Sequence, residues 1–368
     1  MLSLHTEICD MLGIEYPIFA FNHCQDVTAA VSNAGGIGVL GVSGVSFDEK
    51  RVKVEWLRKN TDKPFGLDLL LPQANPDMGT HEELMSKIPR ENIEFMNNLR
   101  KELGIPDGYI APPPLDGLSL GIGGTLASQE EEVDAICDLK PAILACALGA
   151  NATIVEKCHK AGIKVASLAG TVRHALRQAK IGVDIIVAVG TDAGGHTGKI
   201  GTMSLVPQVV DAVKPIPVLA AGGIADGRGI VAALALGAAG VWTGTIWLTA
   251  HENPVEEYIK DRVIHATEED AVITRAFTGK TGRGLKNKFI EYWEQPGAPK
   301  PLPAPFQSMY LPLPISVFTD EDDRTWERLG LHDWISTPAG QGVGLVKQRK
   351  SARNILHDMV AQAIEVLG

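Results

Sequence analysis

The sequence predicts an α/β protein, a (β/α)₈ TIM barrel with an insertion between strands 3 and 4 and a C-terminal extension. Short apolar runs rich in Val, Ile and Ala recur along the 368 residues, and each is followed by a helix-like segment. Eight such runs match the number of strands that a closed parallel barrel needs. The chain is 45% hydrophobic, which is enough to bury a large core.

Each predicted strand ends at a glycine or a polar residue. In the second half of the chain the strands recur about every 20 to 33 residues, as a βα unit requires, and their continuous apolar character suits strands covered on both faces. The eight predicted strands are Pro17–Phe21, Ile37–Val42, Phe65–Leu71, Ala142–Leu148, Lys164–Leu168, Asp184–Val189, Pro217–Ala221 and Gly240–Thr245.

Two segments depart from this βα pattern. Residues 72–141 separate the third and fourth strands and contain a charged helical stretch near residues 82–103. We expect this insertion either to lie over the C-terminal mouth of the barrel and shape a substrate pocket, or to be a surface excursion without a role. The sequence thus divides into a barrel domain over residues 1–250, insertion included, and a C-terminal extension of helices and loops over residues 251–368, packed on the barrel.

Charge and cysteine content exclude several classes of protein. The chain has 34 Lys and Arg against 44 Asp and Glu, a net charge of −10 and no long basic run, which argues against a nucleic-acid partner. The uncharged stretch 229–250 is interrupted by glycines, and residues 1–20 lack the pattern of an export signal. The five cysteines are scattered without CxxC spacing, which supports neither a metal site nor disulfides. We expect a cytoplasmic protein without a membrane span, and the oligomeric state is left open.

A GxGxxG pattern occurs at residues 36–41, but its context differs from that of a dinucleotide-binding fold. In that fold the glycines follow a strand and open a helix. Here residues 28–33 are helix-like and the glycines lead into a strand. We interpret these glycines as allowing a tight helix-to-strand turn.

The strongest functional signal is a pair of glycine-containing loops at the ends of the seventh and eighth strands, Gly222-Gly223 and Gly244-Thr245. A phosphate needs backbone N–H groups brought close without side-chain obstruction, and barrels repeatedly use this pair of loops to bind phosphate. We predict that Gly222, Gly223, Gly244 and the Thr245 hydroxyl bind phosphate. The alternative is that these glycines only allow close helix packing.

One histidine follows the sixth predicted strand directly. His196 lies in the glycine-rich loop 190–198, and a strand end of this kind presents the imidazole at the catalytic face of a barrel. An unperturbed imidazole pKa of about 6.5 suits proton abstraction near neutrality. His196 is therefore the leading candidate for a general base, and His23, just after the first strand, is the second. The alternative for His196 is a structural histidine.

These motifs resemble those of the nitronate monooxygenase family, also called the 2-nitropropane dioxygenase-like flavoproteins. The resemblance rests on residues 31–38, 64–69, 192–198, 221–227 and 244–245, with weaker similarity at 282–289 and 339–345. It therefore covers nearly the whole chain except residues 72–141.

The resemblance implies an FMN-dependent oxidoreductase in which a nitronate gives an electron to FMN, O₂ completes the oxidation, and a carbonyl compound and nitrite leave. Members that also accept neutral nitroalkanes use a histidine to remove the α-proton. The expected catalytic residues are then His196 and His23. The expected cofactor-binding residues are Phe21, Asn22, Asp68, Ser167, Gly194, Gly195, Gly222, Gly223, Trp242, Thr243, Gly244 and Thr245.

Several positions on the substrate side depart from the family pattern. Asp68 stands where an Asn is frequent, Val189 and Trp242 stand where glutamines are common, and Ser167 stands where some members have a catalytic histidine. Residues 21–23 read Phe-Asn-His, whereas relatives often have Ala-Pro-Met.

These departures leave other functions open. Close relatives of the family reduce enoyl thioesters with NAD(P)H, and the insertion could then form part of an acyl pocket. A flavin-free barrel that binds a sugar or polyol phosphate is a third hypothesis, and a non-catalytic scaffold is a fourth. The expected partner in the enzyme hypotheses is a small-molecule substrate, with O₂ or NAD(P)H as co-substrate.

Overall fold

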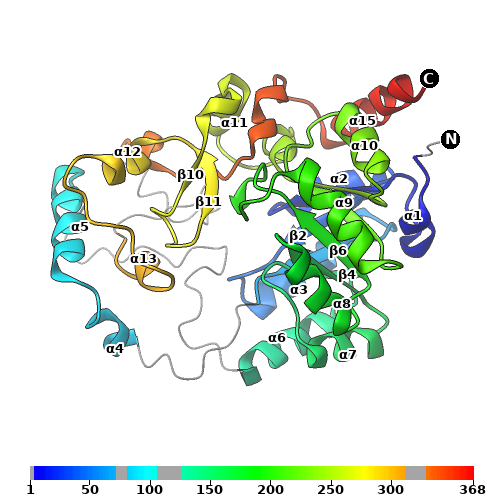
Figure 1. The fold of residues 1–368 in the computed structure, drawn as a ribbon, viewed down its shortest axis with the longest axis horizontal. Helices are drawn as coiled ribbons and strands as arrows, with labels where there is room; N and C mark the ends of the chain where they lie inside the picture. Colours follow the sequence, from blue (N-terminus) through cyan, green and yellow to red (C-terminus); the bar gives the residue numbers. More distant parts are fainter. Residues whose placement is uncertain (1–3, 72–80, 106–125, 312–328) are drawn as a thin grey trace.

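The structure is a computed structural model, and it describes residues 4–71, 81–105, 126–311 and 329–368 (Figure 1). Eight parallel strands close into a barrel in which β9 pairs back to β1, which confirms the predicted fold. All eight predicted strands are present, and their ends differ from the predicted ones by at most two residues. The barrel strands are β1 (Ile18–Asn22), β2 (Ile37–Gly41), β3 (Gly66–Leu69), β4 (Ile143–Cys146), β5 (Lys164–Ala169), β6 (Ile185–Val189), β8 (Val218–Ala221) and β9 (Gly240–Thr243).

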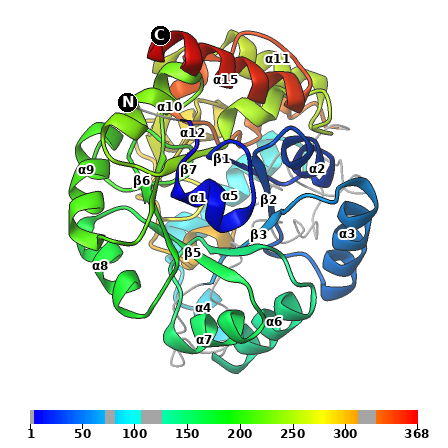
Figure 2. The same ribbon diagram turned by 90° about the vertical axis from the view of Figure 1, so that its right-hand side faces the viewer.

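Apolar side chains fill the inside of the barrel. The inner residues include Phe19, Val39, Ile143, Val187 and Leu219, which are all fully buried. The opposite faces of the same strands pack against the surrounding helices, so both faces are apolar. The short helix α1 (Glu7–Leu12) closes the N-terminal end, because its apolar residues belong to the same cluster as the barrel interior (Figure 2).

A ring of helices surrounds the strands (Figure 2). Side-chain caps begin several of these helices, as where Ser46 and Glu49 form a capping box at α3 and Asp226 accepts hydrogen bonds from the first turn of α10. None of the helices in the described ranges is long and apolar enough to cross a membrane. The ring consists of α2 (Gln25–Asn33), α3 (Phe47–Asn60), α6 (Leu126–Asp138), α7 (Ala152–Lys160), α8 (Val172–Lys180), α9 (Thr202–Val213), α10 (Gly227–Ala235) and α15 (Ala352–Leu367).

Two members of the ring come from the segments assigned to the insertion and the extension. Helix α6 packs against α7, and an ion pair between Lys50 and Glu132 joins it to α3, so the end of the 72–141 segment is an ordinary barrel helix. The C-terminal helix α15 packs between α10 and α2 and completes the ring. We therefore propose that both helices belong to the barrel unit. The added structure is then limited to the residues between β3 and α6 and the residues between β9 and α15.

The added segments share a small core of their own beside the barrel (Figure 1). Met96 and Leu99 of α5 (Arg90–Glu102) cluster with Phe289 and Trp293 of α12 (Lys288–Glu294). We call this unit the cap. It also contains α4 (His81–Met85), α11 (Glu257–His265) and α13 (Phe306–Met309), and a three-stranded sheet of β10 (Ala271–Thr274), β11 (Gly282–Leu285) and β7 (Gly195–His196). Residues 72–80 and 106–125 of the predicted insertion lie outside the described residues.

The glycines of the GxGxxG pattern lead from α2 into β2, and Gly38 and Gly41 lie within the strand itself. A Cβ on Gly38 would lie 2.2 Å from the backbone oxygen of Thr28 in α2, which no side chain could tolerate. The pattern therefore allows α2 and β2 to approach each other closely.

Candidate active site

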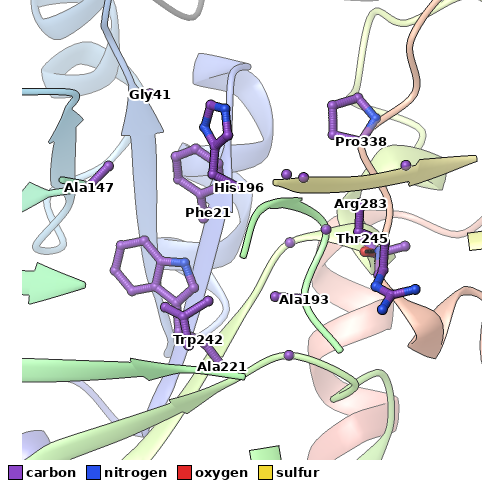
Figure 3. A pocket seen from close by; sticks show the side chains of 18 of the residues that line it. Phe21, Gly41, Ala147, Ala193, His196, Ala221, Trp242, Thr245, Arg283 and Pro338 are labelled. Atoms are coloured by element: carbon purple, nitrogen blue, oxygen red, sulfur yellow. Dashed lines mark hydrogen bonds between the residues drawn. The ribbon is translucent and has the colours of Figure 1, made fainter. Parts of the chain in front are cut away.

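A cavity of about 320 Å³ opens at the C-terminal ends of the barrel strands. Its walls come from the ends of β1, β3, β8 and β9, from the loop after β6, and from the hairpin of β10 and β11 in the cap. Figure 3 shows that Phe21 and Trp242 lie at the barrel wall and Arg283 lies under the hairpin. The carboxyl ends of parallel strands are where barrel enzymes place their active sites.

The glycine loops form one end of this cavity. Gly222 and Gly223 have φ angles of 105° and 74°, a region that favours glycine, and both line the cavity with Gly244 and Thr245. A Cβ on Gly222 would lie 2.9 Å from the backbone nitrogen of Ala193. These loops therefore expose backbone rather than side chains, as a phosphate site requires.

His196 faces the same cavity from the short strand β7, which pairs with β11 of the cap. Its Nε2 lies 2.9 Å from the Thr278 hydroxyl. Burial, helped by the nearby positive charge of Lys280, lowers the pKa of His196 to about 4. The imidazole is therefore neutral at physiological pH.

His23 and Phe21 belong to an aromatic wall. The rings of Phe21 and Trp242 stack with centroids 5.9 Å apart, and His23 meets Phe21 edge to face at 5.1 Å. Burial, with a smaller effect of Lys53, lowers the pKa of His23 to about 4. The two candidate catalytic histidines thus line the same cavity although they are far apart in the sequence.

Asp68 is the acidic side chain among the described residues that line the cavity. It is 4% exposed, and its Oδ2 is buried without a hydrogen-bond partner in the described part of the chain. Burial raises the pKa of Asp68 to about 7. Near neutrality this carboxyl group can therefore be held as the neutral acid.

Two further predicted residues line the cavity with side chains that are already engaged. Asn22 accepts a hydrogen bond from the Cys24 backbone nitrogen at 2.8 Å and donates one to the Ala20 carbonyl at 3.1 Å. The Thr243 hydroxyl donates to the Phe19 carbonyl at 3.0 Å and accepts from the Trp247 indole at 3.0 Å. Both side chains brace the strand ends.

The structure does not bring Ser167 to the cavity, which corrects its prediction as a cofactor-binding side chain. Neighbouring side chains alternate between the two faces of a strand, and the adjacent Ala166 points inward. Ser167 therefore points outward, where its hydroxyl donates to Gln178 of α8 at 3.0 Å. The other predicted residues, Gly194, Gly195 and Trp242 among them, line the cavity.

The cap contributes residues that the sequence analysis did not single out. Thr278, Lys280 and Arg283 all line the cavity. Arg283 is 7% exposed and donates to the carbonyl oxygens of Thr191 and Ala271, so it holds the hairpin against the barrel. The weak family similarity at residues 282–289 was the only sequence signal for this region.

The C-terminal segment also reaches the glycine loops. The Gly340 backbone nitrogen donates to the Thr245 hydroxyl at 3.0 Å, and the Gln341 backbone nitrogen donates to the Asp192 carbonyl at 2.9 Å. No group of three His, Cys, Asp or Glu side chains in the described ranges could hold a metal ion. The cavity therefore combines glycine loops that expose their backbone with a neutral histidine and a buried carboxyl group.

Comparisons with known proteins agree with this arrangement. The family model "Nitronate monooxygenase" matches residues 5–362. Rv1533 of Mycobacterium tuberculosis, which is named as a monooxygenase, is 41% identical over 380 residues that cover 99% of this chain and 98% of that protein. A Staphylococcus aureus protein (strain JH9) named as a nitronate monooxygenase is 33% identical over 305 residues, covering 78% of this chain and 80% of that protein.

Among solved structures, the nitroalkane oxidase of Streptomyces ansochromogenes has a TM-score of 0.78 at 25% identity and covers 98% of both chains. The family match thus extends over the barrel, the cap and the C-terminal helix. The chain belongs to the nitronate monooxygenase family and is an oxidoreductase.

Proposed function

We propose that this protein is an FMN-dependent nitronate monooxygenase that converts alkyl nitronates, and the nitroalkanes from which they form, to carbonyl compounds and nitrite with O₂. The observation that carries this proposal is the neutral His196 in the same cavity as the backbone loops of Gly222-Gly223 and Gly244-Thr245. A phosphate site beside a neutral base suits a nucleotide cofactor that reacts with a carbon acid.

The residues of the cavity fit FMN. The glycine loops suit the phosphate, because they have no Cβ atoms at the points where backbone N–H groups must approach an anion. The carboxyl group of Asp68, which lines the cavity and has an unpartnered oxygen, could form a hydrogen bond with the polar edge of a ring system. Phe21 and Trp242 supply an aromatic wall against which a planar ring can pack.

His196 acts in this proposal as the base for neutral nitroalkanes. Its pKa of about 4 leaves the imidazole unprotonated at neutral pH, and the hydrogen bond with Thr278 fixes the orientation of the ring. Removal of the α-proton converts the nitroalkane to its nitronate. Bound FMN would supply the redox chemistry, by accepting an electron from the nitronate before O₂ completes the oxidation.

The test is anaerobic mixing of the FMN-loaded protein with propyl-2-nitronate and, separately, with NADH and NADPH. We expect the nitronate to bleach the visible flavin absorbance and the nicotinamides to leave it unchanged. Bleaching by NAD(P)H alone, followed by reoxidation with an enoyl thioester, would instead establish the reductase hypothesis. A protein that stays colourless with added FMN would favour the flavin-free phosphate-binding barrel.

A further inference from the structure

The side chain of Asp68 points into the cavity from the inner face of β3. Leu67 and Leu69 belong to the outer cluster that faces the helices, so Asp68 between them faces inward. Gly66, on the same face, lies against the inner residues Val39 and Ile143. Because Asp68 is near the carboxyl end of the strand, its carboxyl group lies at the floor of the mouth and lines the cavity.

No cation in the described residues balances a charge on this carboxyl group. On the neighbouring strands it is flanked by Gly41 and Ala145, which offer no side-chain polar atom. The nearby titratable groups are the Cys146 thiol, which lies on the outer face of β4 and whose pKa is raised by burial and, to a smaller extent, by Asp68, and His23, whose ring lies against the adjacent Gly41 and is neutral near pH 7. An ionised carboxylate here would be buried and unpaired, which is costly, whereas the neutral acid has one proton to donate.

The topology places Asp68 across the mouth from the glycine loops. Those loops follow β8 and β9, and β3 is separated from β9 by β1 and β2 in the barrel order. A flavin nucleotide anchored by its phosphate at the loops extends its ring toward the opposite wall. The ring carries carbonyl and imine acceptors along its polar edge, and Asp68 lines that wall with a carboxyl group whose buried Oδ2 has no hydrogen-bond partner in the described residues.

We propose that Asp68 is held as a neutral carboxylic acid that donates a hydrogen bond to an acceptor atom on the polar edge of the flavin ring, so that cofactor binding takes up one proton whenever the free protein has the carboxylate. This inference rests on the proposed function, because it requires FMN in the cavity. An Asn at this position could donate a similar bond, but only an acid links the bond to pH.

Proton linkage predicts the direction in which the affinity for FMN changes with pH. Burial raises the pKa of Asp68 to about 7 in the free protein, so the acid form is already present below that pH. Above it, binding of FMN must also protonate the carboxylate. The FMN dissociation constant should therefore rise about tenfold for each pH unit above about 7, as linkage of one proton requires.

The experiment measures the FMN dissociation constant of the full chain from pH 6 to 9 by quenching of flavin fluorescence, and the proton uptake by calorimetry in two buffers of different ionisation enthalpy. The matched variant is Asp68→Asn, which keeps a donor and removes the titration. Thermal melts of both proteins establish that the variant is folded. Subtracting the profile of the variant removes the ionisation of FMN itself.

We expect the wild-type protein to take up close to one proton per FMN at pH 8.5, while Asp68→Asn takes up none beyond that of FMN and binds with an affinity that changes less with pH. Equal pH slopes for the two proteins would overturn the inference, and so would tighter wild-type binding at high pH, which would mean that the carboxylate accepts a bond from the ring. In either case FMN still binds, so the proposed function stands. Failure of both proteins to bind FMN would overturn the proposed function as well.

Discussion

The two ends of the cavity are built in different ways. At the phosphate end the chain offers backbone atoms from glycine loops that directly follow β8 and β9. At the reactive end it offers the side chains of Asp68, His23 and His196, whose pKa values are all shifted by burial. The cradle depends on the backbone conformation of its glycine loops, whereas the pKa values of the reactive groups depend on how deeply the cap and the barrel bury them. Substitutions should therefore affect the two ends differently.

The largest effect is expected from His196→Gln at the reactive end. Removal of a general base lowers turnover by about 10²- to 10⁴-fold, and we expect this loss in kcat/KM for a neutral nitroalkane. Oxidation of the preformed nitronate should change little, because its α-proton is already gone. Steady-state O₂ consumption with both substrates measures the difference.

His23→Gln is the matched control, because His23 lines the same cavity and has a similarly lowered pKa. We expect it to lose less activity with the neutral substrate than His196→Gln does. The reverse order would transfer the role of base to His23. In the wild-type protein His196 stays unprotonated above pH 5, so its ionisation should not limit the rate between pH 6 and 8.

The stability of the FMN-free protein should show the cost of burying Asp68. Its pKa rises from 3.8 to about 7 on folding, so the folded state binds the proton more tightly than the unfolded state. The resulting stabilisation is fully present below pH 3.8 and is lost as the pH rises to about 7. At about 1.4 kcal/mol for each pKa unit, the loss amounts to about 4 kcal/mol.

Asp68→Asn removes this titration. Urea unfolding should show the variant gaining stability over the wild type as the pH rises from 5 to 7, with a constant difference above pH 7. Asp211→Asn is the exposed control, because it makes the same substitution at a side chain that is 75% exposed. A pH-independent difference for Asp68→Asn would mean that the carboxyl group is solvated in the free protein.

A smaller effect is expected at the phosphate end from Gly222→Ala. Alanine at a φ of 105° costs about 1–3 kcal/mol, and its Cβ would crowd the Ala193 nitrogen. If the loop relaxes by moving out of the cradle, FMN affinity falls by about 5- to 150-fold. Fluorescence titration with FMN measures this change.

Gly162→Ala separates conformational strain from a role in the site. Gly162 has a similar positive φ of 77° with nothing near its Cβ position, and it lies away from the cavity. We expect this control to lower the melting temperature while leaving FMN affinity unchanged. Equal losses of affinity in the two variants would mean that Gly222 acts only through overall stability.

The same contrast explains what could be predicted from the sequence. The barrel and the position of its glycine loops were predictable because an apolar run that ends in glycines signals a buried strand and an open turn within a few residues, as at Val218–Ala221 followed by Gly222-Gly223. His196 was predictable for the same reason, since it follows β6 directly. The burial that sets its pKa was not, because it depends on Thr278 and Lys280, which are about 80 residues away in sequence and join it only through the pairing of β7 with β11.

Ser167 shows the opposite limit. Similarity to the family placed Ser167 near the carboxyl end of β5. Alternation of side chains along the strand decides which face a residue occupies, and Ser167 faces α8.

The position of α15 in the ring was also not predictable, because the amphipathic pattern of a C-terminal helix does not indicate which helices it packs against. Its packing between α10 and α2 requires the close approach at Gly227, whose Cβ would lie 2.3 Å from the Ala363 nitrogen.

The smallest expected effect tests whether the cap positions the reactive end. Thr278→Val removes the hydroxyl group that hydrogen-bonds to His196 Nε2 and keeps the volume of the side chain. The loss of one hydrogen bond of this kind costs about 1 kcal/mol, so kcat/KM for a neutral nitroalkane should fall about fivefold, while oxidation of the preformed nitronate and FMN affinity stay unchanged. Thr274→Val in the same hairpin is the control, because Thr274 also lines the cavity but its hydroxyl accepts a hydrogen bond from the Ala276 backbone nitrogen instead of contacting His196. If Thr278→Ser retains the activity and Thr274→Val has no effect, the cap orients the base. If the two valine variants have equal effects on both substrates, the hairpin acts only by covering the cavity.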